Sequence, residues 1–334
     1  MIIDYEHKHS GHCESGATAG LLKHNGLEIS EPMAFGIGSG LYFTYMPFIK
    51  AQDAPLFAFR IRPGMVFRNT TRRLNVKTGI FKKFSDPGKA MMLLDENLDK
   101  EIPTGLQVGM YHLKYFPAGY QLPYNFHNIV VFGKENDTYH ISEPNRETTQ
   151  LLTSEDLKKA RFARGMFGPK GKMYYVLEVN QEPDYRKAIR EAIKNTSFKM
   201  TKQRFPFIGV YGIKKLSKDM KNWPKKYPDE KAMFYLLQFV RSIEEFGTGG
   251  AGYRYMYGAF LKEAADLFKH DGLHSDAFRM GEIADLWRDF SYRSARFFKS
   301  RDDSGDNFLT LSDILMEIGN SEEKFFKEIG KTRL

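Results

Sequence analysis

Residues 10–16 read Ser10-Gly11-His12-Cys13-Glu14-Ser15-Gly16 and hold the only cysteine among the 334 residues of the chain. Small and apolar residues follow as far as Asn25-Gly26, a pair that commonly ends a helix. This pattern predicts one short helix whose first turn contains Cys13. Free backbone N–H groups and the positive end of the helix dipole meet in that turn, and they favour the thiolate, the nucleophilic form of cysteine.

Two other interpretations of Cys13 remain open. A free cysteine is most often a small buried hydrophobe. Cys13 can also join His7, His9 and His12 as a metal ligand, because these ligand types lie within seven positions. The sequence contains no second ligand cluster with a zinc spacing, so we expect neither a metal nor another cofactor.

Composition sets the class of protein. A hydrophobic content of 42% with 14% aromatic residues predicts a globular protein of one or two domains. The start of the chain lacks a signal-peptide pattern, and no run approaches the roughly 18 apolar residues of a membrane span. We therefore expect a cytoplasmic protein with no membrane partner.

The net charge of +9 comes from lysine-rich segments without dense basic runs. It predicts mainly a solvated surface, with a basic face for an acidic partner as the alternative. No nucleic-acid-binding motif accompanies the charge, so we expect no nucleic-acid partner.

The character of the sequence changes near residue 180. Before it, strand-like segments such as 57–61 and 173–179 alternate with short helices and with Pro and Gly. After it, the apolar period predicts amphipathic helices over roughly 184–198, 228–246, 251–270, 275–300 and 310–329. We predict two domains, residues 1–180 of mixed α and β structure and residues 181–334 entirely helical.

A glycine-rich segment, Gly247-Thr248-Gly249-Gly250, precedes the expected helix 251–270. The N-terminal amides of such a helix can hold an anion, and Tyr253 and Tyr257 fall on one helix face. Two interpretations stay open: the segment lines a substrate pocket, or it lets the chain pack closely. The candidate substrate-binding residues are Gly249, Gly250, Tyr253, Arg254 and Tyr257. An earlier run, 36–40, leads into a strand-like segment and so does not predict a dinucleotide site.

A base for the cysteine is expected in a hairpin formed by residues 126–133 and 138–145. If Gly133 pairs with Thr138, His127 lies opposite Pro144, beside Glu143 and Asn145. Either Glu143 or Asn145 can then accept a hydrogen bond from Nδ1–H of His127 and orient the ring to take the thiol proton. The alternative is that His127 is an ordinary strand-end residue and Glu143 a solvated charge.

The order of cysteine, histidine and then acid or amide is the papain-like arrangement. It predicts an α+β fold in which an N-terminal helix packs on an antiparallel sheet, followed by an all-helical domain. Such a site also needs a hydrogen-bond donor for the oxyanion. The candidates are His7, which lies six residues before Cys13, together with His9, Ser10 and the backbone N–H of Cys13.

At several places the sequence resembles the butirosin biosynthesis protein H family. The residues that carry this resemblance are His12-Cys13 with the following Leu-Leu-x-x-x-Gly stretch, segment 30–43, and the His127 strand with Glu143-Pro144. Residues 246–250 and 253–257 resemble the C-terminal domain that often accompanies that N-terminal domain. Together the two cover nearly the whole chain.

The resemblance implies a papain-like cysteine fold that is distantly related to the bacteriocin-leader peptidases. In the family's name-giving member it implies acyl transfer from a carrier-protein thioester to the amine of an aminoglycoside. Cys13 would be the nucleophile and His127 the base. This chain departs from those peptidases in two places: Glu143 stands where they have Asp before Pro, and His7 stands at the spacing of their upstream glutamine.

Our leading hypothesis is a cysteine-dependent acyltransferase in secondary-metabolite-type biosynthesis. It would move an acyl group from a thioester to a small-molecule amine acceptor, with an acidic acyl carrier protein as a partner. The first alternative is a papain-like cysteine hydrolase, amidase or peptidase. The second is a non-catalytic binding module that keeps the fold.

Overall fold

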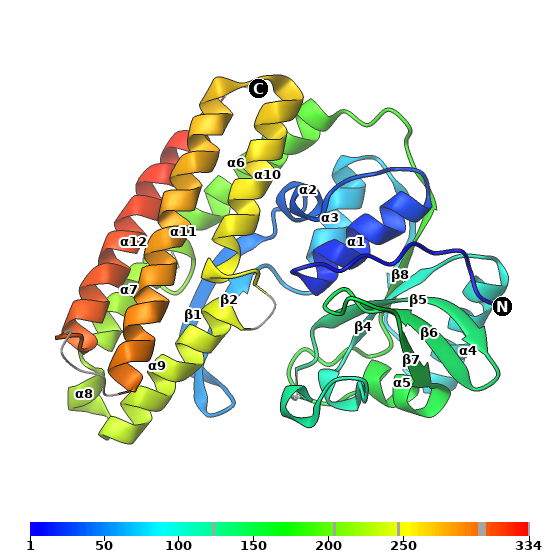
Figure 1. Ribbon diagram of the computed structural model, residues 1–334, viewed down its shortest axis with the longest axis horizontal. Coiled ribbons are helices and arrows are strands. Elements are labelled where there is room, and N and C mark those ends of the chain that lie inside the picture. Colours follow the sequence, from blue (N-terminus) through cyan, green and yellow to red (C-terminus); the bar gives the residue numbers. More distant parts are fainter. Residues whose placement is uncertain (122–123, 203–204, 246–247, 300–304, 333–334) are drawn as a thin grey trace. The chain divides into compact units, whose positions relative to one another are not determined.

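The computed structural model describes residues 1–121, 124–202, 205–245, 248–299 and 305–332 (Figure 1). Contacts divide the described chain into two compact units. The first unit is made of Met1–Ala34 and Arg62–Tyr185, and the second of Phe35–Ile61 and Arg186–Leu334. Within the described residues, none of the helices combines the length and the apolar character that crossing a membrane requires.

The first unit is built on an antiparallel sheet with the strand order β3-β8-β4-β5-β6-β7. Its strands are β3 (Lys77–Lys82), β4 (Thr104–Val108), β5 (His127–Glu135), β6 (Thr138–Ser142), β7 (Gln150–Thr153) and β8 (Met173–Glu178). Its helices are α1 (Cys13–His24), α2 (Glu31–Ile37), whose last residues belong to the second unit, α3 (Met65–Arg73), α4 (Pro87–Asp99) and α5 (Ser154–Arg161). Two 3₁₀ turns, η1 (Met110–His112) and η2 (Ala118–Tyr120), follow β4.

The two faces of this sheet carry different layers. On one face, Ile129 and Val131 of β5 join the core that also contains Leu94 of α4 and Leu157 of α5. Successive side chains of a strand alternate, so Asn128 points to the opposite face, against which α1 packs. The predicted α+β fold is confirmed: a helix that begins at Cys13 lies on an antiparallel sheet.

The first helix has the predicted bounds. It begins at Cys13 and ends at His24, and Gly26 follows in the left-handed conformation with φ of 89°. Its N-cap is His12, whose side chain accepts a hydrogen bond from the backbone N–H of Ser15. Histidine is not among the preferred N-cap residues, so the sequence did not predict this cap.

The register predicted for the β5–β6 hairpin was wrong at the turn. Thr138 pairs with Glu135, and Gly133 pairs with His140, because the turn is shorter than expected. A bulge between Val131 and Gly133 then shifts the pairing by one position toward the other end of the hairpin. As a result, β6 ends at Ser142, and Glu143 still follows it directly beside the start of β5.

The second unit combines helices with one hairpin. Its elements are β1 (Leu41–Ala51), β2 (Ala54–Arg60), α6 (Tyr185–Thr201), α7 (Gly209–Met220), α8 (Trp223–Lys226), α9 (Asp229–Glu244), η3 (Ala251–Tyr253), α10 (Arg254–Phe268), α11 (Asp271–Phe298) and α12 (Phe308–Ile329). Each of the helices predicted after residue 180 has a counterpart among them. Helix α7 was missed, because Gly209 and Gly212 at its start have a low helix propensity. Gly212 is needed there, since a Cβ would lie 2.7 Å from the backbone of Phe207.

Hairpin β1–β2 belongs with these helices although our division at residue 180 placed it in the first domain. It packs on α7 and α9. The ring of Phe43 lies 6.1 Å from Trp287, and that of Phe59 lies 5.4 Å from the same indole. These contacts join segments far apart in the sequence, so a boundary based on composition does not reveal them.

A buried ion pair holds the helices of the second unit together. Arg254 of α10 and Glu322 of α12 are fully buried, with Nε–Oε1 and Nη2–Oε2 distances of 2.8 and 3.0 Å. Trp287 of α11 donates its indole N–H to the same Oε1 at 2.7 Å. Three helices therefore meet at one carboxylate.

Replacing Glu322 by alanine should lower the free energy of unfolding by about 3–5 kcal/mol, because the buried Arg254 charge loses its partner. Urea denaturation followed by tryptophan fluorescence measures the loss, since both tryptophans of the chain, Trp223 and Trp287, lie in the second unit. Asp266→Ala, which breaks the exposed pair with Lys262, is the control and should leave the transition unchanged. Equal stability of the Glu322 variant and the control would contradict this role.

Candidate active site

The turn that precedes Cys13 is held by a carboxylate. Glu31, at the start of α2, accepts hydrogen bonds from the backbone N–H groups of Gly11 and His12 at 3.0 and 2.6 Å. It also accepts from the hydroxyl of Ser15 at 3.3 Å. These bonds fix the backbone where α1 begins. The Cys13 side chain is consequently held at the first turn of the helix with 8% of its surface exposed.

Helix α1 lies close to the loop that follows β6. A Cβ on Gly16 would come within 2.5 Å of Ser10 and 3.1 Å of Pro144, so only glycine permits this approach. The backbone N–H of Ser10 donates to the carbonyl of Pro144 at 2.7 Å, and the Asn145 amide donates to the carbonyl of Ser10 at 3.1 Å. The segment before Cys13 is thus tied to the loop that carries Glu143.

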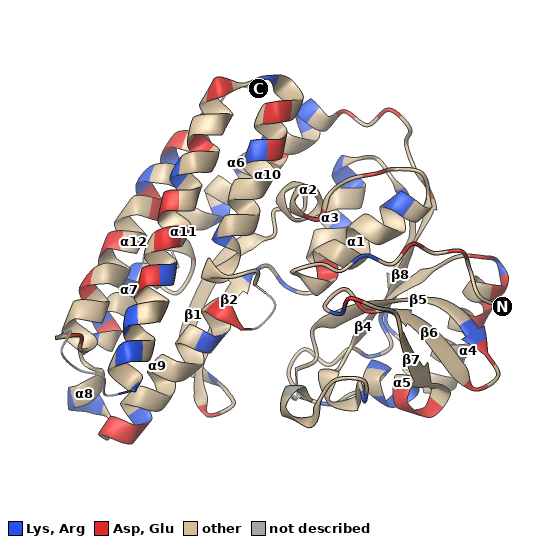
Figure 2. Cartoon of the chain, viewed as in Figure 1, with Lys and Arg blue, Asp and Glu red and all other residues tan. Residues whose placement is uncertain are grey.

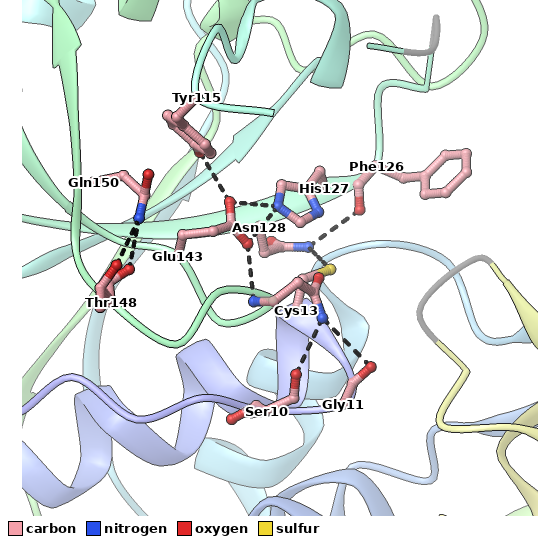
Figure 3. Close-up of polar contacts among 11 residues, drawn as sticks. Ser10, Gly11, Cys13, Tyr115, Phe126, His127, Asn128, Glu143, Thr148 and Gln150 are labelled. Atoms are coloured by element: carbon pink, nitrogen blue, oxygen red, sulfur yellow. Dashed lines mark hydrogen bonds and ion pairs between the residues drawn. The ribbon is translucent and has the colours of Figure 1, made fainter. Parts of the chain in front are cut away.

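His127 and Glu143 form a buried pair (Figure 3). Nε2 of His127 lies 2.9 and 2.8 Å from the two carboxylate oxygens of Glu143, and the residues are 4% and 0% exposed. The carboxylate also accepts the hydroxyl of Tyr115 at 2.8 Å and the backbone N–H of Asn145 at 3.0 Å. Glu143, rather than the side chain of Asn145, therefore contacts the ring. The ring atom involved is Nε2, whereas we expected Nδ1.

The second ring nitrogen of His127 is left for Cys13. Burial lowers the pKa of the His127 imidazole, but the charges of Glu143 and Cys13, and the hydrogen bond that the ring donates to each, raise it to about 10. The ring therefore stays protonated at neutral pH beside the sulfur. An imidazolium next to a cysteine stabilises its thiolate, which is the form needed for nucleophilic attack.

Asn128 was missed by the sequence analysis. It is fully buried, and its amide nitrogen lies 3.9 Å from the sulfur of Cys13 (Figure 3). The orientation of the amide is defined by its neighbours: Nδ2 donates to the carbonyl of Phe126 at 3.3 Å, and Oδ1 accepts the hydroxyl of Tyr174 at 3.0 Å. A signal was present, since Asn128 is a polar residue directly before the apolar run 129–132 of β5.

The residues predicted as oxyanion donors have other contacts. Nε2–H of His7 donates to the carbonyl of Arg146 at 3.0 Å, and its Nδ1 accepts the hydroxyl of Ser142 at 2.8 Å, so the ring has no N–H left for an oxyanion. The Ser10 hydroxyl donates to the carbonyl of Lys8, and His9 is exposed. Within the described residues, no three His, Cys, Asp or Glu side chains come together as a metal site.

Four of the candidate substrate-binding residues of the second unit, Gly250, Tyr253, Arg254 and Tyr257, are buried inside it, and Gly249 is exposed. Gly249 and Gly250 adopt left-handed conformations with φ of 65° and 86°. Tyr253 stacks on Phe35 with ring centroids 5.1 Å apart, and Tyr257 is fully buried. Arg254 is committed to Glu322. Of the two interpretations left open, this arrangement favours close packing.

Family models match both the N-terminal and the C-terminal part of the chain. The family described as "Butirosin biosynthesis protein H, N-terminal" matches residues 12–144, and the family described as "Domain of unknown function (DUF4872)" matches residues 155–329. The chain therefore belongs to the butirosin biosynthesis protein H family. A search of curated proteins gives no match.

Among solved structures, the chain is similar to a putative C39-like peptidase from Bacillus anthracis. The two share 12% sequence identity over 54% of this chain and 98% of that chain, with a TM-score of 0.38. A likeness at this level does not establish a shared reaction.

The imidazole of His127 should titrate near pH 10 in an NMR experiment on the intact protein, far above its ordinary pKa of about 6.5. Glu143→Gln should lower the midpoint, because the carboxylate that stabilises the imidazolium is gone. Cys13→Ala should lower it too. Asn145→Ala is the matched control, since the Asn145 side chain contacts backbone carbonyls rather than the ring. A wild-type midpoint near 6.5 would refute the ion pair.

Proposed function

We propose that this member of the butirosin biosynthesis protein H family is a cysteine-dependent acyltransferase that moves an acyl group from a thioester to an amine. The observation that carries the proposal is the buried His127, which has Glu143 on one ring nitrogen and Cys13 on the other. This constellation contains a nucleophile, a proton carrier and an orienting carboxylate.

The first half of the reaction acylates the enzyme. The Cys13 thiolate attacks the thioester carbonyl, and the carbon–sulfur bond of the donor breaks as the new thioester forms. The departing thiolate takes the proton of the His127 imidazolium. Glu143 keeps the ring oriented throughout and stabilises its positive charge. The product of this half is an acyl-Cys13 intermediate and a free donor thiol.

The second half releases the acyl group. An amine attacks the acyl-Cys13 carbonyl and gives a proton to the now neutral His127. An amide leaves, and Cys13 and His127 return as thiolate and imidazolium. If water attacks instead of an amine, the same residues perform a hydrolysis, so the hydrolase alternative differs only in the acceptor. The thioester starting point follows from the family's name-giving reaction.

Asn128 fits the role of oxyanion donor. In the tetrahedral intermediate the negative oxygen is bonded to the carbon that is attached to the Cys13 sulfur. An N–H 3.9 Å from that sulfur is close enough to reach the oxygen. The carbonyl of Phe126 can only accept hydrogen bonds, so it holds the donating end of the amide toward the site.

The partners belong to the same proposal. A small-molecule amine is the acceptor, and an acidic acyl carrier protein is compatible as the donor with the net charge of +9. Along α11 and α12, however, residues of both signs are interspersed (Figure 2). The helical unit therefore resembles a solvated surface more than a one-signed docking face.

Incubation with an acetyl thioester of N-acetylcysteamine should add one acetyl group to the protein, detected by intact-mass spectrometry and mapped to Cys13. Cys13→Ala should show no adduct, because the acceptor sulfur is gone. Loss of the adduct on adding amines, but not in buffer alone, identifies a transferase, whereas equal loss in buffer identifies a hydrolase. Failure of several activated donors to modify the wild-type protein would contradict the proposal.

Asn128→Ala should slow this acylation by about 10²–10³-fold, because one oxyanion donor is removed. Alkylation of Cys13 by iodoacetamide forms no oxyanion and should change far less. Asn145→Ala, which also removes a side-chain amide near the site, serves as the control and should acylate close to the wild-type rate. If both reactions of the Asn128 variant slowed equally, Asn128 would be acting on the thiol and not on the oxyanion.

A further inference from the structure

A row of polar side chains crosses the sheet of the first unit, starting at the Cys13 site. Asn128 of β5 pairs with Gln107 of β4, and the pairing of Leu106 with Met173 puts Lys172 next in line. Side chains of directly paired residues lie on the same face of a sheet. The row of Asn128, Gln107 and Lys172 therefore lies on the α1 face. Nζ of Lys172 donates to Oε1 of Gln107 at 3.3 Å.

Two more lysines stand at the far end of this row. Lys82 of β3 pairs with Met173, which puts the following residue, Lys83, beside Lys172. Lys170 is brought to the same place because its carbonyl accepts the backbone N–H of Phe84 at 2.9 Å. Both Lys83 and Lys170 are exposed, and Lys172 is half-buried.

Arg62, which precedes α3, completes the group. Burial is the largest factor that lowers the pKa of Lys172, and the positive charges of Arg62, Lys170 and Lys83 lower it further, while Glu14 opposes them. Glu14 is fully buried and accepts the backbone N–H groups of Val66 and Phe67 at 2.8 and 3.3 Å. The basic cluster, defined as Arg62, Lys83, Lys170 and Lys172, thus carries more positive charge than Glu14 can balance.

The loop that carries Lys170 has a backbone conformation that is fixed by hydrogen bonds. Phe167 and Lys170 have left-handed backbones with φ of 57° and 54°, a conformation that costs energy for residues other than glycine. Gln107 donates through Nε2 to the carbonyls of Asn125 and Phe167 at 2.7 and 2.9 Å. The Asn125 amide donates to two further loop carbonyls, at 3.0 and 3.1 Å. Gln107 of β4 and Asn125, which precedes β5, therefore hold this loop against the sheet.

We propose that the basic cluster is an anion subsite that binds a phosphate group of the acyl donor while its thioester lies at Cys13. This inference rests on the proposed acyl transfer. Neighbouring strands are about 4.8 Å apart, so Lys172 and Lys83 lie about 10 and 14 Å from Asn128 across the sheet. The donor must then carry its phosphate on a long arm. An acyl phosphate is too short, whereas a phosphate-terminated pantetheine thioester has such an arm.

Three acetyl donors test the subsite: the N-acetylcysteamine thioester without phosphate, acetyl-phosphopantetheine with one, and acetyl-coenzyme A with more. The acylation rate of Cys13, followed by intact mass, should be higher for the two phosphorylated donors. In the double variant Lys83→Gln/Lys170→Gln this preference should fall by about tenfold or more, because charge-assisted hydrogen bonds to the phosphate are lost. The rate with the neutral donor should not change.

The matched control is Lys89→Gln/Lys100→Gln, which removes the same charge from exposed positions of the first unit outside the basic cluster. It should keep the preference. Equal gains from phosphopantetheine and coenzyme A assign the arm phosphate, which a carrier-borne donor shares, and a further gain with coenzyme A assigns the free coenzyme. Equal rates with all three donors in the wild type, or a preference untouched by the double variant, would overturn the subsite.

A failure of the proposed function gives a different result. If no donor acylates Cys13, the proposed acyltransferase function is contradicted. The subsite is then tested by calorimetric titration of coenzyme A into Cys13→Ala. Binding that weakens by about tenfold in the Lys83→Gln/Lys170→Gln background supports the subsite on its own. Absence of binding to Cys13→Ala, or binding that is equal in both backgrounds, overturns it.

Discussion

The hydrogen-bonded pair of His127 and Glu143 is the interaction on which the site depends. A buried imidazole would ordinarily lose its proton, and a buried carboxylate would be costly without partners. Here each compensates the other, and Tyr115 and the Asn145 backbone complete the carboxylate's hydrogen bonds. The pair therefore holds a positive charge beside the sulfur of Cys13, the only cysteine of the chain. The other parts of the first unit hold these groups in position.

Two groups of residues hold the site in position, one at the start of α1 and the other on the sheet. Glu31 fixes the backbone where α1 begins, and Gly16 allows α1 to lie close to the loop after β6. Cys13 is thereby held near the start of β5. On the same face of the sheet, Gln107 links Asn128 to the loop carrying Lys170. One set of buried amides thus organises both the reacting end of the site and the basic cluster. In the second unit, by contrast, the candidate binding residue Arg254 forms a buried ion pair with Glu322 that joins helices.

Local patterns predicted much of this structure. The bounds of α1, the helices after residue 180, and the proximity of His127 to Glu143 follow from caps, apolar periods and hairpin spacing. The register at Gly133 was wrong because the turn is shorter than expected, and the bulge between Val131 and Gly133 was not predicted either. The ring nitrogen that bonds Glu143 depends on a side-chain rotation, which spacing does not determine. Arg254 was a candidate binding residue because it follows the glycine-rich segment in an expected helix, and its partner Glu322 lies 68 positions away in the sequence. Asn128 was overlooked because the residues that it contacts belong to α1 and β8, which are distant from it in the sequence.

The measurement that tests the central claim most directly is the rate of Cys13 alkylation by iodoacetamide as a function of pH. A thiolate paired with the His127 imidazolium should react at an undiminished rate well below the ordinary thiol pKa of about 8.5, and His127→Ala should move the rise in rate back toward that value. A wild-type rate that rises only near 8.5, and is unchanged in His127→Ala, would show an unactivated thiol and contradict the enzymatic account.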